Sequence, residues 1–200
     1  MNKLNTGDII LFKKNRKSII STITHSPYTH AAIVVKNPWW NNIDKGLYVI
    51  QSSYGIYKYK DIEQNKFISG VQMEYLDDVI KNRKVDVRYL VGINRDNLFK
   101  KKFKSIHDDT FKKPYDYSYC DWINTGLYNL GCKCFYNHKH TNDFWCSALV
   151  AYFYTKMGWI DKNTDWSNIT PADLSKINTI NNIILGDTVP LNYNNNYTLV

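Results

Sequence analysis

The sequence predicts an α+β fold, because short β-type runs fill its first half and helical patterns flank and follow them. The β-type runs are rich in Ile and Val and are separated by Gly, Pro and Asn. The longest helical pattern, residues 96–111, repeats its apolar side chains every three or four positions. No internal repeat or linker interrupts the 200 residues, so we expect a single domain over residues 1–200.

Two of the runs predict a β-hairpin. Residues 30–36 (HAAIVVK) and 47–53 (LYVIQSS) are apolar and β-branched, and the loop at 38–46 has a length that suits antiparallel pairing. A further strand is expected at 7–14, after a Gly-Asp turn. The segment 18–26 suits one or two helical turns that end before a proline.

The middle of the chain alternates strand and helix. We expect a strand from Gly70, a short helix from Leu76 to Ile80 and a strand from Val85 to Leu90. Asp96 is suited to cap the next helix, whose lysines point to solvent while its apolar residues share one face: Leu98, Phe99, Phe103 and Ile106. Residues 187–200 are expected to form a loosely held C-terminal tail.

Charge and composition exclude several classes of protein. The formal net charge is +8, but the lysines are scattered and no arginine-rich stripe is present, so no nucleic-acid partner is expected. The N-terminal apolar run IILF is too short for a signal peptide, and no segment approaches the roughly 18 to 20 apolar residues that span a bilayer. Four cysteines are too few for a disulfide scaffold. We therefore expect a cytoplasmic or intracellular protein.

Cys146 occupies the first turn of a predicted helix. The residues three, four, seven and eleven positions further on are apolar and trace one helical face, and Gly158 ends the helix. The first turn presents unpaired N–H groups and the positive end of the helix dipole, and both favour a thiolate. The same N–H groups can stabilise an oxyanion. Cys146 is thus a candidate nucleophile; the alternative is a buried thiol that fills a gap in the core.

A nucleophilic cysteine needs a base, and His30 is the best-placed histidine. It stands at the entrance of the first hairpin strand, a rigid element, whereas His25 is expected in a turn and His107 on the polar side of a helix. Strand alternation lets the hairpin bring the Gln51 amide beside His30, where it can orient the imidazole. The alternative for Gln51 is a polar side chain on a half-exposed strand.

Taken in order, several segments resemble one branch of the papain-like cysteine hydrolases, the circularly permuted NlpC/P60 proteins. The segments are TGDIILF, SPYTHAAIVV, YVIQSS, KPYDYSY, DFWCSALVAYFY and TPADL, and they cover about residues 7–174. The likeness is to YiiX-like bacterial members and to poxvirus and giant-virus members. It implies a papain-like fold in which a small antiparallel sheet or partial barrel packs against helices. It also implies a catalytic triad without a cofactor: Cys146 as nucleophile, His30 as base and Gln51 as the third residue, where relatives often have Glu.

The resemblance also implies substrate and further site residues. Relatives act on peptide amides or lipid acyl groups, so an acyl-enzyme is expected, with a peptide, isopeptide or lipid acyl substrate and either hydrolysis or transfer. Tyr115 and Asp116 match a Tyr-Asp pair that leads toward the nucleophile helix, and Asp8 matches a structural turn. Trp145 and Trp39 are candidates to hold an apolar substrate or to contact a membrane surface transiently; core packing is their alternative role.

Two further hypotheses stay open at this stage. Gln51 in place of an acid is also compatible with a catalytically silent binding protein on the same fold. A structural zinc site is the other alternative, although its spacing is uncommon for a zinc finger and we expect no metal. The candidate zinc ligands are Cys120, Cys132, Cys134, His138 and His140.

Overall fold

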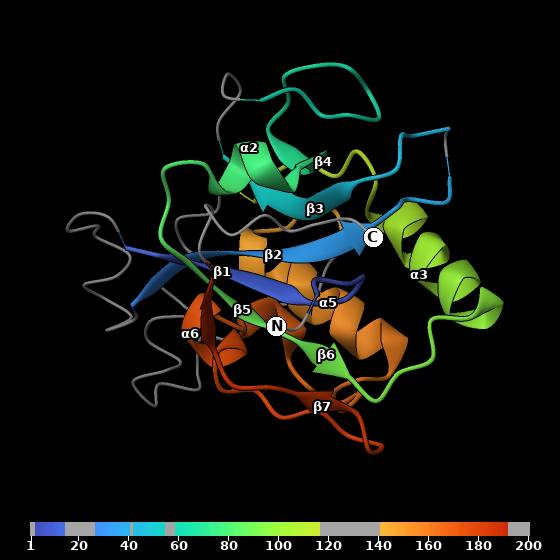
Figure 1. The fold of residues 1–200 in the computed structure, drawn as a ribbon, viewed down its shortest axis with the longest axis vertical. Coiled ribbons are helices and arrows are strands. Elements are labelled where there is room, and N and C mark those ends of the chain that lie inside the picture. The colour runs from blue at the N-terminus through green and yellow to red at the C-terminus, as the bar shows by residue number, and fades with distance from the viewer. Residues whose placement is uncertain (1–2, 15–26, 41, 55–58, 117–140, 192–200) are drawn as a thin grey trace.

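The computed structural model describes residues 3–14, 27–40, 42–54, 59–116 and 141–191. Within these residues the main sheet has six strands, all paired antiparallel, in the order β4-β3-β2-β1-β5-β8 (Figure 1). Their bounds are β1 (Ile9–Lys13), β2 (Tyr28–Lys36), β3 (Leu47–Ser53), β4 (Gly70–Tyr75), β5 (Val85–Arg88) and β8 (Val189–Leu191). A smaller sheet pairs β6 (Leu90–Val91) with β7 (Ile184–Leu185).

Helices cover both faces of the main sheet. On one face lies α5 (Cys146–Met157), which contacts β2 and β3 and packs beside α3 (Asn97–Thr110). The short helix α2 (Leu76–Ile80) contacts β3 and β4 and appears in front of the sheet in Figure 1, with α5 behind it. A 3-10 turn η1 (Trp166–Asn168) contacts α5, and α6 (Pro171–Leu174) contacts both α5 and β2. The chain is therefore α+β, with an antiparallel sheet packed against helices.

Alternation along the central strands builds two apolar layers. Odd-numbered residues of β1 and β2, such as Leu11 and Ile33, pack with α5, whereas even-numbered ones, such as Phe12 and Val34, pack with α2. Because both faces are covered, the run AAIVV of β2 is apolar without a break and fully buried. His30 and Gln51 alternate with the residues of the α5 layer. Their side chains therefore leave the strands on the face of the sheet that α2 covers.

Helix α5 is the most buried of the described α-helices, and several hydrogen bonds fix its position. Ten of its residues are buried on all sides of the helix, so the single apolar stripe expected from the sequence is too narrow a description. Gly158 ends it in the left-handed conformation, with φ of 80°. The Tyr154 hydroxyl donates to the Gly7 carbonyl at 2.6 Å, and the Ser147 hydroxyl donates to the Ile169 carbonyl at 2.6 Å.

The predicted hairpin, both long helices and the short helix α2 are confirmed, and four details are wrong. The strand expected from Val85 to Leu90 is divided, because Val85–Arg88 forms β5 of the main sheet and Leu90 begins β6 of the smaller sheet. Leu98 is 74% exposed and does not share the buried face of α3. His107 is buried, because its Nε2 lies 2.8 Å from Glu63 Oε2 in a loop that covers the helix. Residues 189–191 of the predicted loose tail form the edge strand β8 on β5, where Pro190 is tolerated because an edge needs no further donor.

Two expectations concern other parts of the chain. The predicted helical turns at 18–26 lie outside the described residues. Among the helices that the structure describes, none is long and apolar enough to cross a membrane.

Candidate active site

Cys146 is the first residue of α5, and backbone N–H groups surround its sulfur. The preceding residue, Trp145, caps the helix with extended backbone and no side-chain hydrogen bond to the first turn. The sulfur accepts hydrogen bonds from the N–H groups of Ser147 and Ala31. Register pairs of β2 with β3 begin only at Ile33, so the Ala31 N–H lies beyond the paired part of the hairpin and is directed at the thiol instead. These donors stabilise negative charge on the sulfur.

The imidazole of His30 lies against Cys146 and hydrogen-bonds to it. Burial by itself would raise the pKa of the Cys146 thiol, but the positive His30 ring and the surrounding hydrogen bonds outweigh burial and lower that pKa. Burial would likewise lower the pKa of His30, yet the charge of the Cys146 thiolate and the bonds to Cys146 and Gln51 raise it. The arrangement therefore favours a thiolate–imidazolium pair.

Gln51 holds the other side of the His30 ring. Its Oε1 lies 2.6 Å from His30 Nε2, which leaves Nδ1 as the ring nitrogen available to Cys146. The Phe12 ring packs on His30 with ring centroids 5.0 Å apart, and this contact limits rotation of the imidazole. The structure thus brings together Cys146, His30 and Gln51 from α5, β2 and β3.

A fourth polar residue, Glu74, completes a buried chain and was not predicted. Its Oε2 accepts a hydrogen bond from Gln51 Nε2, and its side chain is buried on β4. Burial raises the pKa of Glu74 to about 7, although the Gln51 bond and the positive charges of His30 and Arg83 act to lower it. The signal in the sequence is an acid in the strand-like run GVQMEY; only the pairing of β3 with β4 shows which residue it faces.

Tyr115 and Asp116 pair with Phe144, which lies two residues before α5. Tyr115 forms a parallel bridge with Phe144, and the Asp116 N–H donates to the Phe144 carbonyl at 3.2 Å. Asp116 is buried, and Trp145 is also buried in the core that α5 shares with the sheet. Trp145 therefore adjoins the thiol in the chain but packs inward, and Trp40 is buried too.

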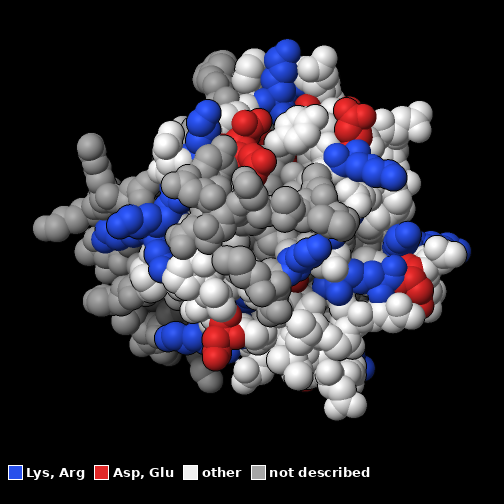
Figure 2. Space-filling model, viewed as in Figure 1, with Lys and Arg blue, Asp and Glu red and all other residues white. Residues whose placement is uncertain are grey.

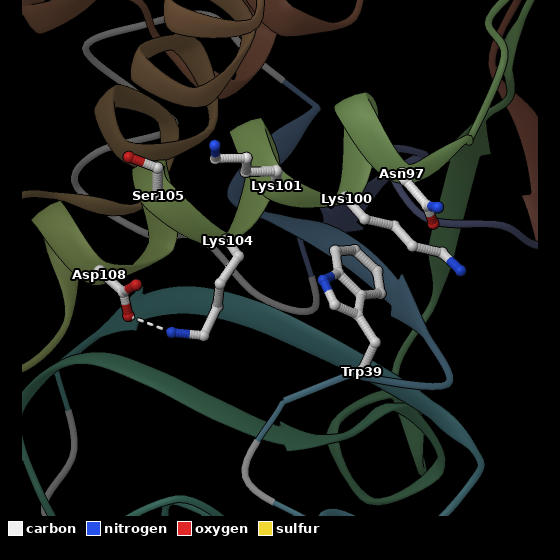
Figure 3. Close-up of a pocket in the computed structure, with 7 residues that line it drawn as sticks. All are labelled: Trp39, Asn97, Lys100, Lys101, Lys104, Ser105 and Asp108. Atoms are coloured by element: carbon white, nitrogen blue, oxygen red, sulfur yellow. Dashed lines mark hydrogen bonds and ion pairs between the residues drawn. The ribbon is translucent and has the colours of Figure 1, made fainter.

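Trp39 lies away from the thiol, on the surface of α3. Its ring centroid is 5.9 Å from that of Phe103, which in turn packs on Phe153 of α5. Phe153 is about 10 Å along the helix axis from Cys146. Figure 3 shows the Trp39 indole beside the side chains of α3 that line an open hollow. The volume of this hollow is about 630 Å³. The hollow is lined by Trp39, Asn97, Lys100, Lys101, Lys104, Ser105 and Asp108.

Charged side chains are distributed over the surface in Figure 2. On the face shown, Lys and Arg groups occupy several separate places, and Asp or Glu groups lie next to some of them. Lys104, for example, pairs with Asp108 on α3 (Figure 3). The visible face therefore offers no continuous basic patch among its described residues.

The metal hypothesis concerns residues at 120–140, which lie outside the described ranges. In the part of the chain that the structure describes, no group of three or more His, Cys, Asp or Glu side chains is placed to hold a metal ion. The chemistry of the described site is that of a thiol, an imidazole and backbone N–H groups.

No protein-family model and no curated protein matches the chain.

Proposed function

We propose that the protein is a thiol hydrolase or acyltransferase that acts on amide, ester or thioester bonds through an acyl-enzyme on Cys146. The observation that carries the proposal is the position of the His30 ring, which bonds to Cys146 on one side and to Gln51 Oε1 at 2.6 Å on the other. A half-buried imidazole in this position serves as base and acid for a cysteine nucleophile.

The chain order of the site supports a circularly permuted, papain-like architecture of the NlpC/P60 kind. His30 and Gln51 come from the N-terminal hairpin, and Cys146 comes later, at the start of the helix that packs on that hairpin. Of the segments that carry the resemblance, three cover most of β1, β2 and β3 of the sheet, and two cover α6 and most of α5. The family assignment rests on this resemblance and on the site geometry.

The proposed reaction has two steps. The Cys146 thiolate attacks the carbonyl carbon, a C–S bond forms, and the first-turn N–H groups of α5 stabilise the oxyanion. The imidazolium of His30 gives its proton to the leaving nitrogen, oxygen or sulfur, and the bond to the leaving group breaks. In the second step neutral His30 takes a proton from water or another acceptor, which attacks the acyl-enzyme and releases the thiolate.

Peptide, isopeptide and lipid acyl groups are the proposed substrates. A membrane-surface contact through tryptophan is not part of the proposal, because Trp40 and Trp145 are buried and Trp39 packs on α3. Nucleic acid is not a proposed partner.

Intact-mass spectrometry tests the proposal directly. The protein is incubated with activated acyl esters, peptide thioesters and mixed lipid and peptide extracts, and the mass of any covalent adduct is measured. We expect an acyl adduct that the Cys146→Ala variant does not form, and the mass of the adduct identifies the acyl class. If no donor leaves an adduct that depends on Cys146, the acyl-enzyme proposal is wrong.

Alkylation distinguishes the enzyme from a catalytically silent binding protein on the same fold. Iodoacetamide is added at pH 6, and the labelling rate of each cysteine is measured by peptide mapping. An activated thiolate at Cys146 predicts faster labelling there than at Cys120, Cys132 or Cys134. Equal rates at all four cysteines would favour the silent protein.

A further inference from the structure

Glu74 lies one hydrogen bond behind the proposed triad. It stands on β4, opposite Val49 of β3, and its side chain is 3% exposed. Its Oε2 accepts from Gln51 Nε2, and Gln51 Oε1 faces His30. The buried chain therefore runs from thiol to imidazole to amide to carboxyl, across four secondary-structure elements.

The carboxylate decides the direction of the amide. An amide by itself can present either its oxygen or its NH₂ group to an imidazole nitrogen. An ionised carboxylate only accepts hydrogen bonds, so the NH₂ group of Gln51 must face Glu74 and its oxygen must face His30. Because that oxygen accepts a hydrogen bond, His30 Nε2 must carry a proton. The remaining nitrogen, Nδ1, is then the one that hydrogen-bonds to Cys146.

We propose that Glu74 is a positioning residue for the thiol chemistry: its carboxylate orients the Gln51 amide and, through it, stabilises the imidazolium form of His30. This inference rests on the proposed function, because it assigns Glu74 a role only if the thiolate–imidazolium pair is the reactive form. Gln51 carries no charge of its own, and Glu74 supplies the negative charge from the next strand.

The charged groups around Glu74 set the pH range of this effect. His30 on β2 and Arg83 after α2 favour its ionised form, whereas Asp61, in the loop before β4, opposes it. Burial raises the pKa of Glu74 to about 7, so the carboxylate forms as the pH rises through neutrality. Below that range a protonated Glu74 can donate to the amide, and the amide loses its fixed direction.

The test is the pH profile of Cys146 alkylation by iodoacetamide in the Glu74→Gln variant. The new amide oxygen can still accept from Gln51, so a hydrogen bond is kept, but the negative charge is lost and the side chain at 74 no longer only accepts. We expect the rate at pH 7 to 7.5 to fall about three- to tenfold, as loss of a nearby charge commonly implies. The main rise in rate should move to alkaline pH, where a thiolate forms without the imidazolium.

Two companion variants separate charge from structure. The double variant Gln51→Glu, Glu74→Gln places the carboxylate directly on His30 and should restore the neutral-pH rate. The Asp8→Asn variant removes another buried carboxyl, at the turn before β1, and should leave the shape of the pH profile unchanged.

The outcomes distinguish the two proposals. An unchanged profile in Glu74→Gln, or a double variant no faster than Glu74→Gln, overturns the role of Glu74 while the acyl-enzyme proposal stands. Slow Cys146 labelling in the wild-type protein itself, with no acyl adduct, overturns the proposed function.

Discussion

For single residues, the reactivity of Cys146 depends on two ionised groups, its own thiolate and the His30 imidazolium, and burial disfavours both. The thiol is buried and the imidazole is half-buried, and the charge of each ionised form is stabilised chiefly by the other. The N–H groups of Ala31 and Ser147 add donors that need no rearrangement when the charge forms. A single substitution at His30 therefore removes the main support of the thiolate.

Replacing His30 with Ala tests this dependence. An ordinary thiol with a pKa near 8.5 is well below 1% ionised at pH 6, but a thiolate of lower pKa is also less nucleophilic. Because these effects partly cancel, we expect Cys146 alkylation at pH 6 to slow about tenfold or more. The measurement is the iodoacetamide labelling rate by intact mass.

His25→Ala serves as the matched control for that substitution and should label at the wild-type rate. Equal slowing in both variants would show that the loss of any histidine perturbs the thiol, and the specific pairing with His30 would then be refuted.

At the element scale, the start of α5 is held by contacts with the sheet edge. Ser52 of β3 donates to the Phe144 carbonyl, two residues before the thiol. The Phe144 N–H donates to the Pro114 carbonyl at 3.2 Å, and the Lys113 carbonyl accepts from Val71 of β4. These bonds place the first turn of α5 against β2 and β3, where His30 and Gln51 lie.

Gly70 permits this close approach and should not tolerate a side chain. Its φ is 134°, and a Cβ built there would overlap the Lys113 carbonyl oxygen. We expect Gly70→Ala to lower the free energy of unfolding by about 3 kcal/mol or more, through backbone strain plus displacement of the 113–116 segment. Urea denaturation measures the change, and Cys146 alkylation should slow because α5 shifts.

Gly158→Ala is the control, since its φ is 80° but nothing lies within 4 Å of the added Cβ. In this variant only the backbone conformation is strained, so the free energy of unfolding should fall by about 1 kcal/mol. If the two alanine variants were equally stable, the close packing at Gly70 would not matter for the fold.

At the scale of the whole molecule, Asp8 joins the N-terminal turn to β6, the strand that follows β5. Its carboxylate accepts from the Leu90 N–H at 2.8 Å and from the Asn5 N–H at 2.7 Å, and Arg95 lies 3.9 Å away. Burial nevertheless outweighs these contacts and raises the pKa of Asp8 to about 6. The folded protein therefore keeps a proton there that the unfolded chain has released.

This proton uptake predicts that Asp8 makes stability fall as the pH rises. As the pH rises from the unfolded pKa of 3.8 to the folded pKa of about 6, the contribution of Asp8 to the free energy of unfolding decreases by roughly 3 kcal/mol, at about 1.4 kcal/mol per pKa unit. The stability advantage of the wild type over Asp8→Asn should thus be larger at pH 4 than at pH 6.5. Urea denaturation of both proteins at both pH values provides the measurement, and parallel pH dependences would contradict the assignment.

Local patterns in the sequence predicted much of the site. The 3.6-residue period placed Cys146 at a helix start, and the period of two in the hairpin placed Gln51 beside His30. Glu74 could not be found in this way, because nothing local shows that β4 pairs with β3 rather than with another strand. His107 was misplaced for the same reason: a helix pattern does not show that Glu63 will cover its outer side.

Local patterns predict the type of most elements and the helix turn that carries the thiol, because helix and strand periods and glycine ends are properties of neighbouring residues. They do not show which strands adjoin, how far β2 and β3 pair before they part at Ala31, or which side chain lies behind the Gln51 amide. These features depend on contacts between residues far apart in the chain, whose energies no local pattern records.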